Sequence, residues 1–358
     1  MTPEVQLEAE ATGGVETRRR RFAGRRWREH LGLTLALLAL FCFLTLTAPN
    51  FLTATNLTNV MHQVAYVGII AWAMTLVILA GEIDISVGSA AAFAGVLLAL
   101  LLQARLPAAL AVTGTLLIGT SIGLLAGSIR AAFLIPSFIV TLALYEALRG
   151  LGLLLTNAIP QAPETLHNRA FTFLGSGDLA GIPVAAVILI VLFAIFWFVS
   201  TRTIFGKSVY AIGGNAEAAR LAGIRVARIR TVLFGLTGLM AALSGVLLAA
   251  SLGAGDPETS VGLEFDAIAA VIVGGTNLFG GSGSLVGTAI GVIFIGILGN
   301  GLVLLGVNPY ATTVVRGAVI LVAVLVTSPG LRDRLQDLGR EARRLTAGAK
   351  SDQSSKGR

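Results

Sequence analysis

Residues 182–200 read IPVAAVILIVLFAIFWFVS and contain no charged side chain. A helix needs about 20 apolar residues to cross the roughly 30 Å hydrocarbon core of a bilayer, so this stretch predicts a membrane-spanning helix. Similar apolar stretches recur along the chain. The ten candidate spans are 31–48, 64–80, 87–104, 107–128, 132–154, 182–200, 231–254, 266–279, 285–306 and 311–327. The sequence therefore predicts an all-α membrane protein with about ten transmembrane helices.

The composition of the chain excludes a soluble globular protein. Hydrophobic residues make up 55% of the 358 residues and charged residues 13%, whereas a soluble domain is about 25% charged. The single cysteine, Cys42, lies within an apolar stretch, so we expect no disulfide framework and no metal site. The histidines, His30, His62 and His167, lie in different segments. We therefore expect no catalytic residues, and enzyme functions are disfavoured.

The distribution of charge predicts how the chain is oriented in the membrane. Lys and Arg residues cluster in the segments 18–28, 202–230 and 332–358. The acidic segments 157–181 and 255–265 contain only one cation, Arg169. Cationic loops of membrane proteins tend to stay in the cytoplasm, and ten spans place all three basic segments there and both acidic segments outside. This separation favours a lipid bilayer over nucleic acid as the partner.

The predicted topology divides the chain into three parts. Residues 1–30 form a basic cytoplasmic tail, residues 31–327 form the polytopic domain, and residues 328–358 form a second basic cytoplasmic tail. The polytopic domain contains a cytoplasmic loop at 201–230. We expect a multi-pass protein of the cell membrane with both termini in the cytoplasm.

Two stretches interrupt the apolar pattern with glycine and polar residues. Residues 79–89 read LAGEIDISVGS and residues 274–284 read GGTNLFGGSGS. Each follows a span that enters the cytoplasm and precedes one that leaves it, which indicates two weakly repeated halves, 64–200 and 266–327. Paired glycine-interrupted segments in corresponding positions are typical of a transport pathway. The candidate pathway residues are Asp84, Ser86, Ser89, Pro136 and Asn277.

Two of these assignments depend on local structure. Pro136 lies within the predicted span 132–154 and is expected to kink it, because its ring removes one intrahelical hydrogen bond. The segment 81–86 has two interpretations at this stage. It is either a tight cytoplasmic turn whose carboxylates, Glu82 and Asp84, are solvated, or a stretch of broken backbone that lines a polar pathway.

Residues 213–224, GGNAEAARLAGI, carry the signals of a short helix. Asn215 is a favourable N-cap, Glu217 stands in the first turn, Arg220 stands near the end, and Gly223 suits the left-handed position after the helix. We predict a two-turn helix outside the membrane. The small alanine side chains would let this helix fit closely into a groove of another protein. The alternative is an amphipathic connector that lies on the membrane surface.

The chain has no nucleotide site that we can recognise. Residues 201–208, TRTIFGKS, end like a phosphate-binding loop, but Thr201 stands where that loop requires its first glycine, and a membrane helix precedes it. We expect no cofactor in this chain. If transport is driven by ATP, another polypeptide binds the ATP.

Several stretches resemble known permeases. Glu217-Ala218-Ala219 followed by Gly223 matches the EAA-type coupling loop of the permease subunits of ABC importers. Five blocks, in order, resemble the ribose/xylose-type monosaccharide permeases: Gly81–Ser89, Pro136–Leu142, Arg149-Gly150, Tyr210–Ile224 and Gly274–Gly287. The resemblance covers about 35–327. It departs from the family at Glu82, where sugar permeases often have glycine, and at Leu233–Leu236, where the extended EAA pattern has an I-x-L-P element.

The resemblance implies a permease subunit of a bacterial ABC importer that pairs with itself or a related permease in the plasma membrane. Cytoplasmic ATP-binding subunits would dock on 215–223, and an extracytoplasmic solute-binding protein would deliver a monosaccharide. The residues that would couple the chain to the ATPase are Gly213, Gly214, Asn215, Glu217, Ala218, Ala219, Arg220 and Gly223.

Other functions remain open from the sequence. A branched-chain amino acid permease shares the broad architecture and a similar cytoplasmic loop. A self-contained secondary transporter would need buried ion-coupling groups, for which Asp84 and Glu146 are the candidates, although Glu146 is expected to pair with Arg149 three positions later. A membrane scaffold that does not transport is disfavoured by the glycine-interrupted segments.

Overall fold

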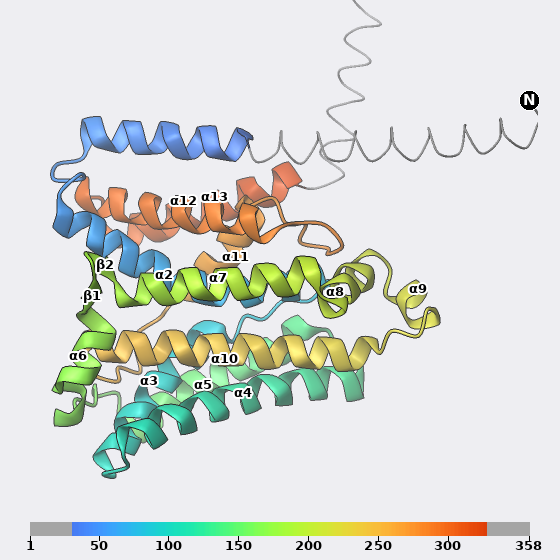
Figure 1. Cartoon of the computed structure of the whole chain (residues 1–358), viewed down its shortest axis with the longest axis horizontal. Coiled ribbons are helices and arrows are strands. Elements are labelled where there is room, and N and C mark those ends of the chain that lie inside the picture. The colour runs from blue at the N-terminus through green and yellow to red at the C-terminus, as the bar shows by residue number, and fades with distance from the viewer. Residues whose placement is uncertain (1–30, 328–358) are drawn as a thin grey trace, which may run out of the picture.

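The computed structural model describes residues 31–327, and the two predicted tails lie outside the described residues. Its long helices run alongside one another in a single bundle (Figure 1). The short helix α9 protrudes at one end of this bundle, and α6 lies at the other. We call these the α9 end and the α6 end.

Helices dominate the described part of the chain. The elements are a helix at Leu31–Thr47, α2 (Ala54–Leu79), α3 (Val87–Gln103), α4 (Ala108–Phe133), α5 (Ser137–Thr156), the 3-10 helix η1 (Glu164–His167), α6 (Arg169–Ser176), β1 (Asp178–Leu179), β2 (Ile182–Pro183), α7 (Val184–Arg202), α8 (Ile204–Gly214), α9 (Ala216–Leu221), α10 (Val226–Leu252), α11 (Leu263–Val273), α12 (Leu285–Leu304) and α13 (Pro309–Thr327). The two strands form a small antiparallel hairpin between α6 and α7.

The apolar helices confirm an all-α membrane protein. Six of them, α2, α4, α5, α7, α10 and α12, are long and apolar enough to cross a bilayer. The helices Leu31–Thr47, α3 and α13 are also apolar. The shortest is α11, whose 11 residues span about 16 Å at 1.5 Å per residue. Each predicted span overlaps one of these ten helices, while the number of crossings stays a prediction.

The predicted kink at Pro136 is wrong. The helix α4 continues to Phe133 and ends at Leu134, which has a left-handed φ of 54°. Pro136 occupies the N-cap position of α5, with an extended ψ of 134°. A proline restricts the residue before it to extended conformations, so this sequence separates two helices and does not bend one. The span predicted at 132–154 therefore begins five residues later, at Ser137.

The interior of the bundle is built from close helix contacts. The helix α10 packs against α2, α3 and α4. At Gly238 of α10, a Cβ atom would overlap the carbonyl oxygen of Gly119 in α4. Small residues let the backbones of membrane helices approach in this way. The helices α2 and α10 are accordingly the most enclosed of the long apolar helices.

Two short helices begin within the bundle and not at its ends. The non-helical segment 80–86 leads to α3, and residues 253–262 lead to α11. Their first turns meet, because a Cβ on Gly88 of α3 would overlap the carboxylate of Glu264 in α11. Glu264 is fully buried there. Non-helical backbone at membrane depth is tolerated where protein covers it. The segment 80–86 is mostly buried, whereas 253–262 is exposed at Glu258 and Val261.

Candidate functional site

The segment 213–224 folds as the sequence predicts. The side chain of Asn215 caps α9 by accepting a hydrogen bond of 2.9 Å from the backbone N–H of Ala218. Gly223 follows the helix with a φ of 86°, a left-handed conformation that favours glycine. The helical part, Ala216–Leu221, comprises six residues. The expected caps are confirmed, whereas a role in coupling stays a proposal.

The surface of α9 is charged and open to solvent. Glu217 and Arg220 form an ion pair of 2.6 Å, and each side chain is 64% exposed. The hydrogen bonds and the positive charge of Arg220 hold the pKa of Glu217 below its ordinary value. Leu221 is exposed beside them, whereas Ala219 is buried against the rest of the chain. The helix therefore offers a firm, partly apolar surface outside the bundle (Figure 1).

The helix α8 connects α9 to both glycine-interrupted segments. A Cβ on Gly213, near the end of α8, would overlap the backbone of Leu79 and of Gly281. Tyr210, one turn earlier, donates a hydrogen bond of 3.1 Å from its hydroxyl to the carbonyl of Gly283. The stretches 79–89 and 274–284 therefore meet at the base of α8, as backbone in contact with backbone.

The segment 81–86 is not a solvated turn, and that interpretation of the sequence is wrong. It passes between α5 and α10 without regular secondary structure, and Asp84 is 2% exposed. Asp84 accepts hydrogen bonds from the backbone N–H of Ser86 at 3.0 Å and from its hydroxyl at 2.6 Å. The hydroxyl of Thr237 in α10 donates to the other carboxylate oxygen. Asp84 thus joins the start of α3 to α10.

The start of α5 satisfies the backbone of the same segment. The hydroxyl of Ser137 accepts a hydrogen bond of 3.2 Å from the N–H of Ile83, and the hydroxyl of Thr141 accepts one of 3.2 Å from Ile85. Side chains on α5 therefore satisfy two buried backbone N–H groups that have no partner in a helix or sheet.

Glu82 is the centre of a buried ion cluster that the sequence did not predict. Its carboxylate lies 2.7 Å from Nη2 of Arg130, at the end of α4, and 2.8 Å from Nε of Arg230, near the start of α10. Arg230 also donates a hydrogen bond of 3.2 Å to the carbonyl of Ala80. Glu82 is 4% exposed. The cluster ties the segment 81–86 to both neighbouring helices, one of which follows α9 directly.

The remaining candidate pathway residues do not form one continuous surface. The hydroxyl of Ser89, in α3, donates to the carbonyl of Ser86 at 3.0 Å. Asn277 accepts a hydrogen bond of 3.1 Å from the N–H of Phe279 within its own loop. Pro136 lies next to Ser137 and so flanks the segment 81–86. The structure brings Asp84, Ser86 and Ser89 together and keeps Asn277 in the second interrupted segment.

The expected ion pair between Glu146 and Arg149 is not among the ion pairs of the described residues. The Nη1 atom of Arg149 instead donates hydrogen bonds to the carbonyls of Pro257 at 2.6 Å and Thr259 at 2.8 Å. Glu146 is exposed. Arg149 therefore holds the loop that leads to α11, a partner that helical spacing could not reveal.

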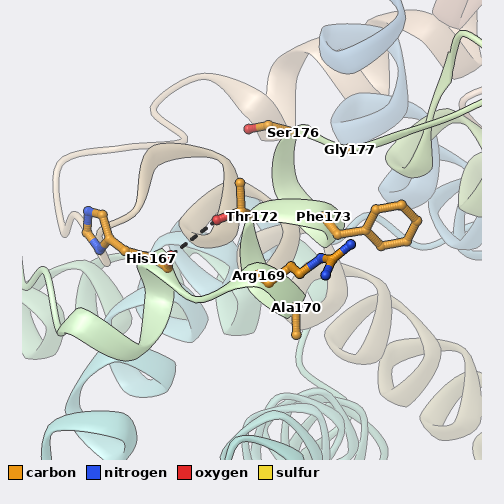
Figure 2. A pocket seen from close by; sticks show the side chains of 7 residues that line it. All are labelled: His167, Arg169, Ala170, Thr172, Phe173, Ser176 and Gly177. Atoms are coloured by element: carbon orange, nitrogen blue, oxygen red, sulfur yellow. Dashed lines mark hydrogen bonds between the residues drawn. The ribbon is translucent and has the colours of Figure 1, made fainter.

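A wide hollow lies over α6 (Figure 2). It measures about 830 Å³ and is lined by His167, Arg169, Ala170, Thr172, Phe173, Ser176 and Gly177. The hydroxyl of Thr172 bonds to the carbonyl of His167 at 3.4 Å. Arg169 and Phe173 lie beside each other at its surface, as Figure 2 shows. The hollow is at the α6 end and is separate from α9.

Long apolar helices, buried non-helical segments and a capped helix at one end define a multi-pass membrane transport protein. The chain belongs to the family described as branched-chain amino acid transport system / permease component, whose model matches residues 56–324. The family consists of transport subunits and not catalytic ones.

Curated relatives match nearly the whole described region. The probable ABC transporter permease protein YphD of Escherichia coli (strain K12) is 51% identical over 306 residues, which cover 86% of this chain and 91% of the relative. The ribose import permease protein RbsC of the same strain is 40% identical over 86% of this chain and 96% of its own. The L-arabinose ABC transporter permease protein AraH of Azospirillum brasilense is 40% identical over 82% and 86%. No solved structure matches the chain.

Proposed function

We propose that this chain is the membrane permease of an ATP-driven importer for a monosaccharide of the ribose, xylose or arabinose type. The named sugars of the relatives support the substrate class. The observation that carries the mechanism is the position of α9. It is exposed at one end of the bundle, and its two flanking helices both contact the segment 79–89.

The proposed topology has ten crossings with both tails in the cytoplasm of a bacterium. In this arrangement α3 and α11 complete their crossings through the non-helical segments 80–86 and 253–262. The helix Leu31–Thr47 begins at the α9 end of the bundle, and α13 ends there (Figure 1). Basic residues are retained on the cytoplasmic side, which makes the α9 end cytoplasmic and the α6 end extracytoplasmic.

In this proposal, movements of the ATP-binding subunits are transmitted to the pathway through α9. Two ATP-binding subunits, which hold the ATP, dock on α9 of this chain and of a second permease copy. The docking residues are those predicted from the sequence, Gly213, Gly214, Asn215, Glu217, Ala218, Ala219, Arg220 and Gly223. Displacement of α9 moves α8 and α10, and these helices act on the segment 79–89 through Gly213 and Arg230.

The solute-binding protein approaches from the opposite end. The hollow over α6 offers it an open surface with a cation, Arg169, and an aromatic ring, Phe173. The candidate pathway residues Asp84, Ser86, Ser89, Pro136 and Asn277 lie between the two docking ends. In this mechanism the permease changes conformation and performs no bond chemistry.

A branched-chain amino acid is the second candidate substrate, because the description of the matching family names that transport system. The identities to the ribose and arabinose permeases, 40% each, favour a sugar. Uptake measurements distinguish the two. Cells that express the complete complex are expected to accumulate radiolabelled ribose, xylose or arabinose, and not leucine.

The assembly is tested by isolating the tagged chain in mild detergent and identifying its partners by mass spectrometry. An ATP-binding subunit and a solute-binding protein are expected, and ATP depletion should stop uptake. If an intact, transport-competent preparation contains neither subunit, and an ionophore rather than ATP depletion abolishes uptake, the chain is a self-contained transporter and the proposal fails.

A further inference from the structure

A cavity with a mostly apolar lining lies between α2, α10, α11, α12 and α13, away from α9 and from the segment 81–86. It measures about 250 Å³, which is smaller than the roughly 300–1,000 Å³ of pockets for drug-sized ligands. Its apolar wall includes Val67, Leu248 and Ile295. The cavity is therefore suited to a small molecule.

An ion pair forms the polar side of this cavity. Asp266 on α11 is 9% exposed, and its Oδ1 lies 3.3 Å from Nε of Arg316 on α13. An ionisable residue inside a membrane bundle is costly and marks a functional site by default. The helix α13 holds Arg316 in its interior, and the guanidinium also lies over Gly262, at the start of α11.

The pair keeps hydrogen-bonding capacity for a ligand. Within the part of the chain that the structure describes, Nη1 and Nη2 of Arg316 and Oδ2 of Asp266 have no hydrogen-bond partner. Ser260 borders the same cavity, while its hydroxyl is buried away from the open space. Gln63 adds an exposed amide. Donors and acceptors thus converge on one small space.

The charges at the cavity disfavour a ligand that carries a net charge. One carboxylate and one guanidinium sum to zero charge, so a simple anion or cation would meet one like charge, whereas a neutral sugar or a zwitterionic amino acid would not. Hydroxyl groups donate and accept hydrogen bonds, and they can therefore satisfy Asp266, Arg316 and Gln63 together. The apolar side chains of the wall would pack against the C–H groups on one face of a sugar ring.

We propose that the cavity at Asp266 and Arg316 is a binding site for the transported monosaccharide within each permease chain. This inference rests on the proposed function and extends it from the α9 end to a defined site. Asp266 and Arg316 are then the residues that select the substrate. The candidate pathway residues Asp84, Ser86 and Ser89 have a structural role instead, because their hydrogen bonds join α3 to α10.

The single cysteine makes the test direct. In a Cys42→Ser background, Gly299→Cys places a thiol on the cavity wall, where a Cβ meets no atom within 4 Å. Thr55→Cys is the matched control, because Thr55 is exposed on α2 outside the cavity. The complex with its ATP-binding subunits is treated with a small water-soluble thiosulfonate, with and without ribose, xylose, arabinose or leucine. Uptake of each of these sugars and of leucine by the complex is measured in parallel.

The transported sugar is expected to slow modification of Gly299→Cys several-fold and to leave Thr55→Cys unchanged. Adding Asp266→Asn or Arg316→Gln should raise the half-protecting sugar concentration at least about tenfold, because a hydrogen bond to a charged group is lost. If Gly299→Cys does not assemble, Thr312→Cys replaces it, since Thr312 lines the same cavity.

Three outcomes overturn the site. One is unchanged modification of Gly299→Cys by a sugar that the complex imports, which leaves the proposed function standing. Another is equal slowing at Thr55→Cys. The third is protection by leucine alone, and if leucine is also the imported solute, the proposed function fails with it.

Discussion

The backbone N–H of Gly281 donates a hydrogen bond of 2.9 Å to the carbonyl of Leu79, and this bond joins the two glycine-interrupted segments of the chain. Gly213 fits against the same bond, because a Cβ there would overlap both partners. Three backbone segments from distant parts of the sequence therefore meet without an intervening side chain. The junction lies at the base of the helix that leads to α9.

Gly213→Ala is expected to disrupt this junction. A methyl group has no space between two backbones that cannot yield, and overpacking of this kind costs about 1–3 kcal/mol. The thermal midpoint of the purified protein in detergent should fall, and uptake should fall with it. Gly214→Ala is the control for the midpoint, because its Cβ meets nothing within 4 Å. Equal midpoints for the two variants would show that the contact is not tight.

The Glu82 cluster should respond unequally to loss of its members. Glu82→Gln leaves the partly buried Arg130 and Arg230 without a counter-charge, and breaking a fully buried pair typically costs about 3–5 kcal/mol, which is an upper bound here. Arg130→Gln leaves Glu82 paired with Arg230 and should cost less. Thermal unfolding in detergent measures both, with the exposed Glu146→Gln as a control that changes little. A larger loss for Arg130→Gln than for Glu82→Gln would contradict the role given to Glu82.

Thr237→Val tests the attachment of Asp84 to α10. The substitution keeps the shape of the side chain and removes the hydroxyl that donates to the carboxylate. Loss of a hydrogen bond to a charged group is expected to lower stability by about 1.5–3 kcal/mol. Thr58→Val removes only an exposed bond within α2 and should be nearly neutral. The idea fails if the two substitutions shift the unfolding midpoint alike.

Glu217→Lys is expected to abolish uptake while the permease still inserts and folds. Glu217 is largely exposed, so the fold should tolerate the change, whereas the reversed charge breaks the pair with Arg220 and opposes the positive end of α9. Uptake and recovery of the ATP-binding subunit report the effect. Glu164→Lys, an exposed position at the α6 end, is the control for recovery of the ATP-binding subunit. Normal uptake by Glu217→Lys would remove α9 from the coupling mechanism.

The fold was predictable where its signals were local. The run 182–200 is uninterrupted, so composition alone indicated α7. The end signals Asn215 and Gly223 act within a few residues, and they located α9 correctly. Pro136 was misjudged because an apolar run continues on both sides of it. Only the conformations of Leu134 and Pro136 reveal that α4 and α5 are separate helices.

The site was less predictable, because its contacts join distant residues. The carboxylate of Glu82 finds partners on α4 and α10, and neither helical nor strand periodicity links these positions. Asp266 and Arg316 stand on different helices for the same reason. A cation within an apolar span was the available signal for Arg316, but only the packing of α11 against α13 identifies Asp266 as its partner.

The Glu82 cluster also determines the order in which parts of the bundle can assemble during synthesis of the chain. Arg230 and the Ala80 carbonyl that it contacts are 150 positions apart, and chains are made at about 5–20 residues per second. Glu82 is therefore synthesised roughly 7–30 s before its second arginine exists. During that interval the segment 81–86 has no complete counter-charge within the chain. The first five helices must wait for α10 before this part of the bundle can close.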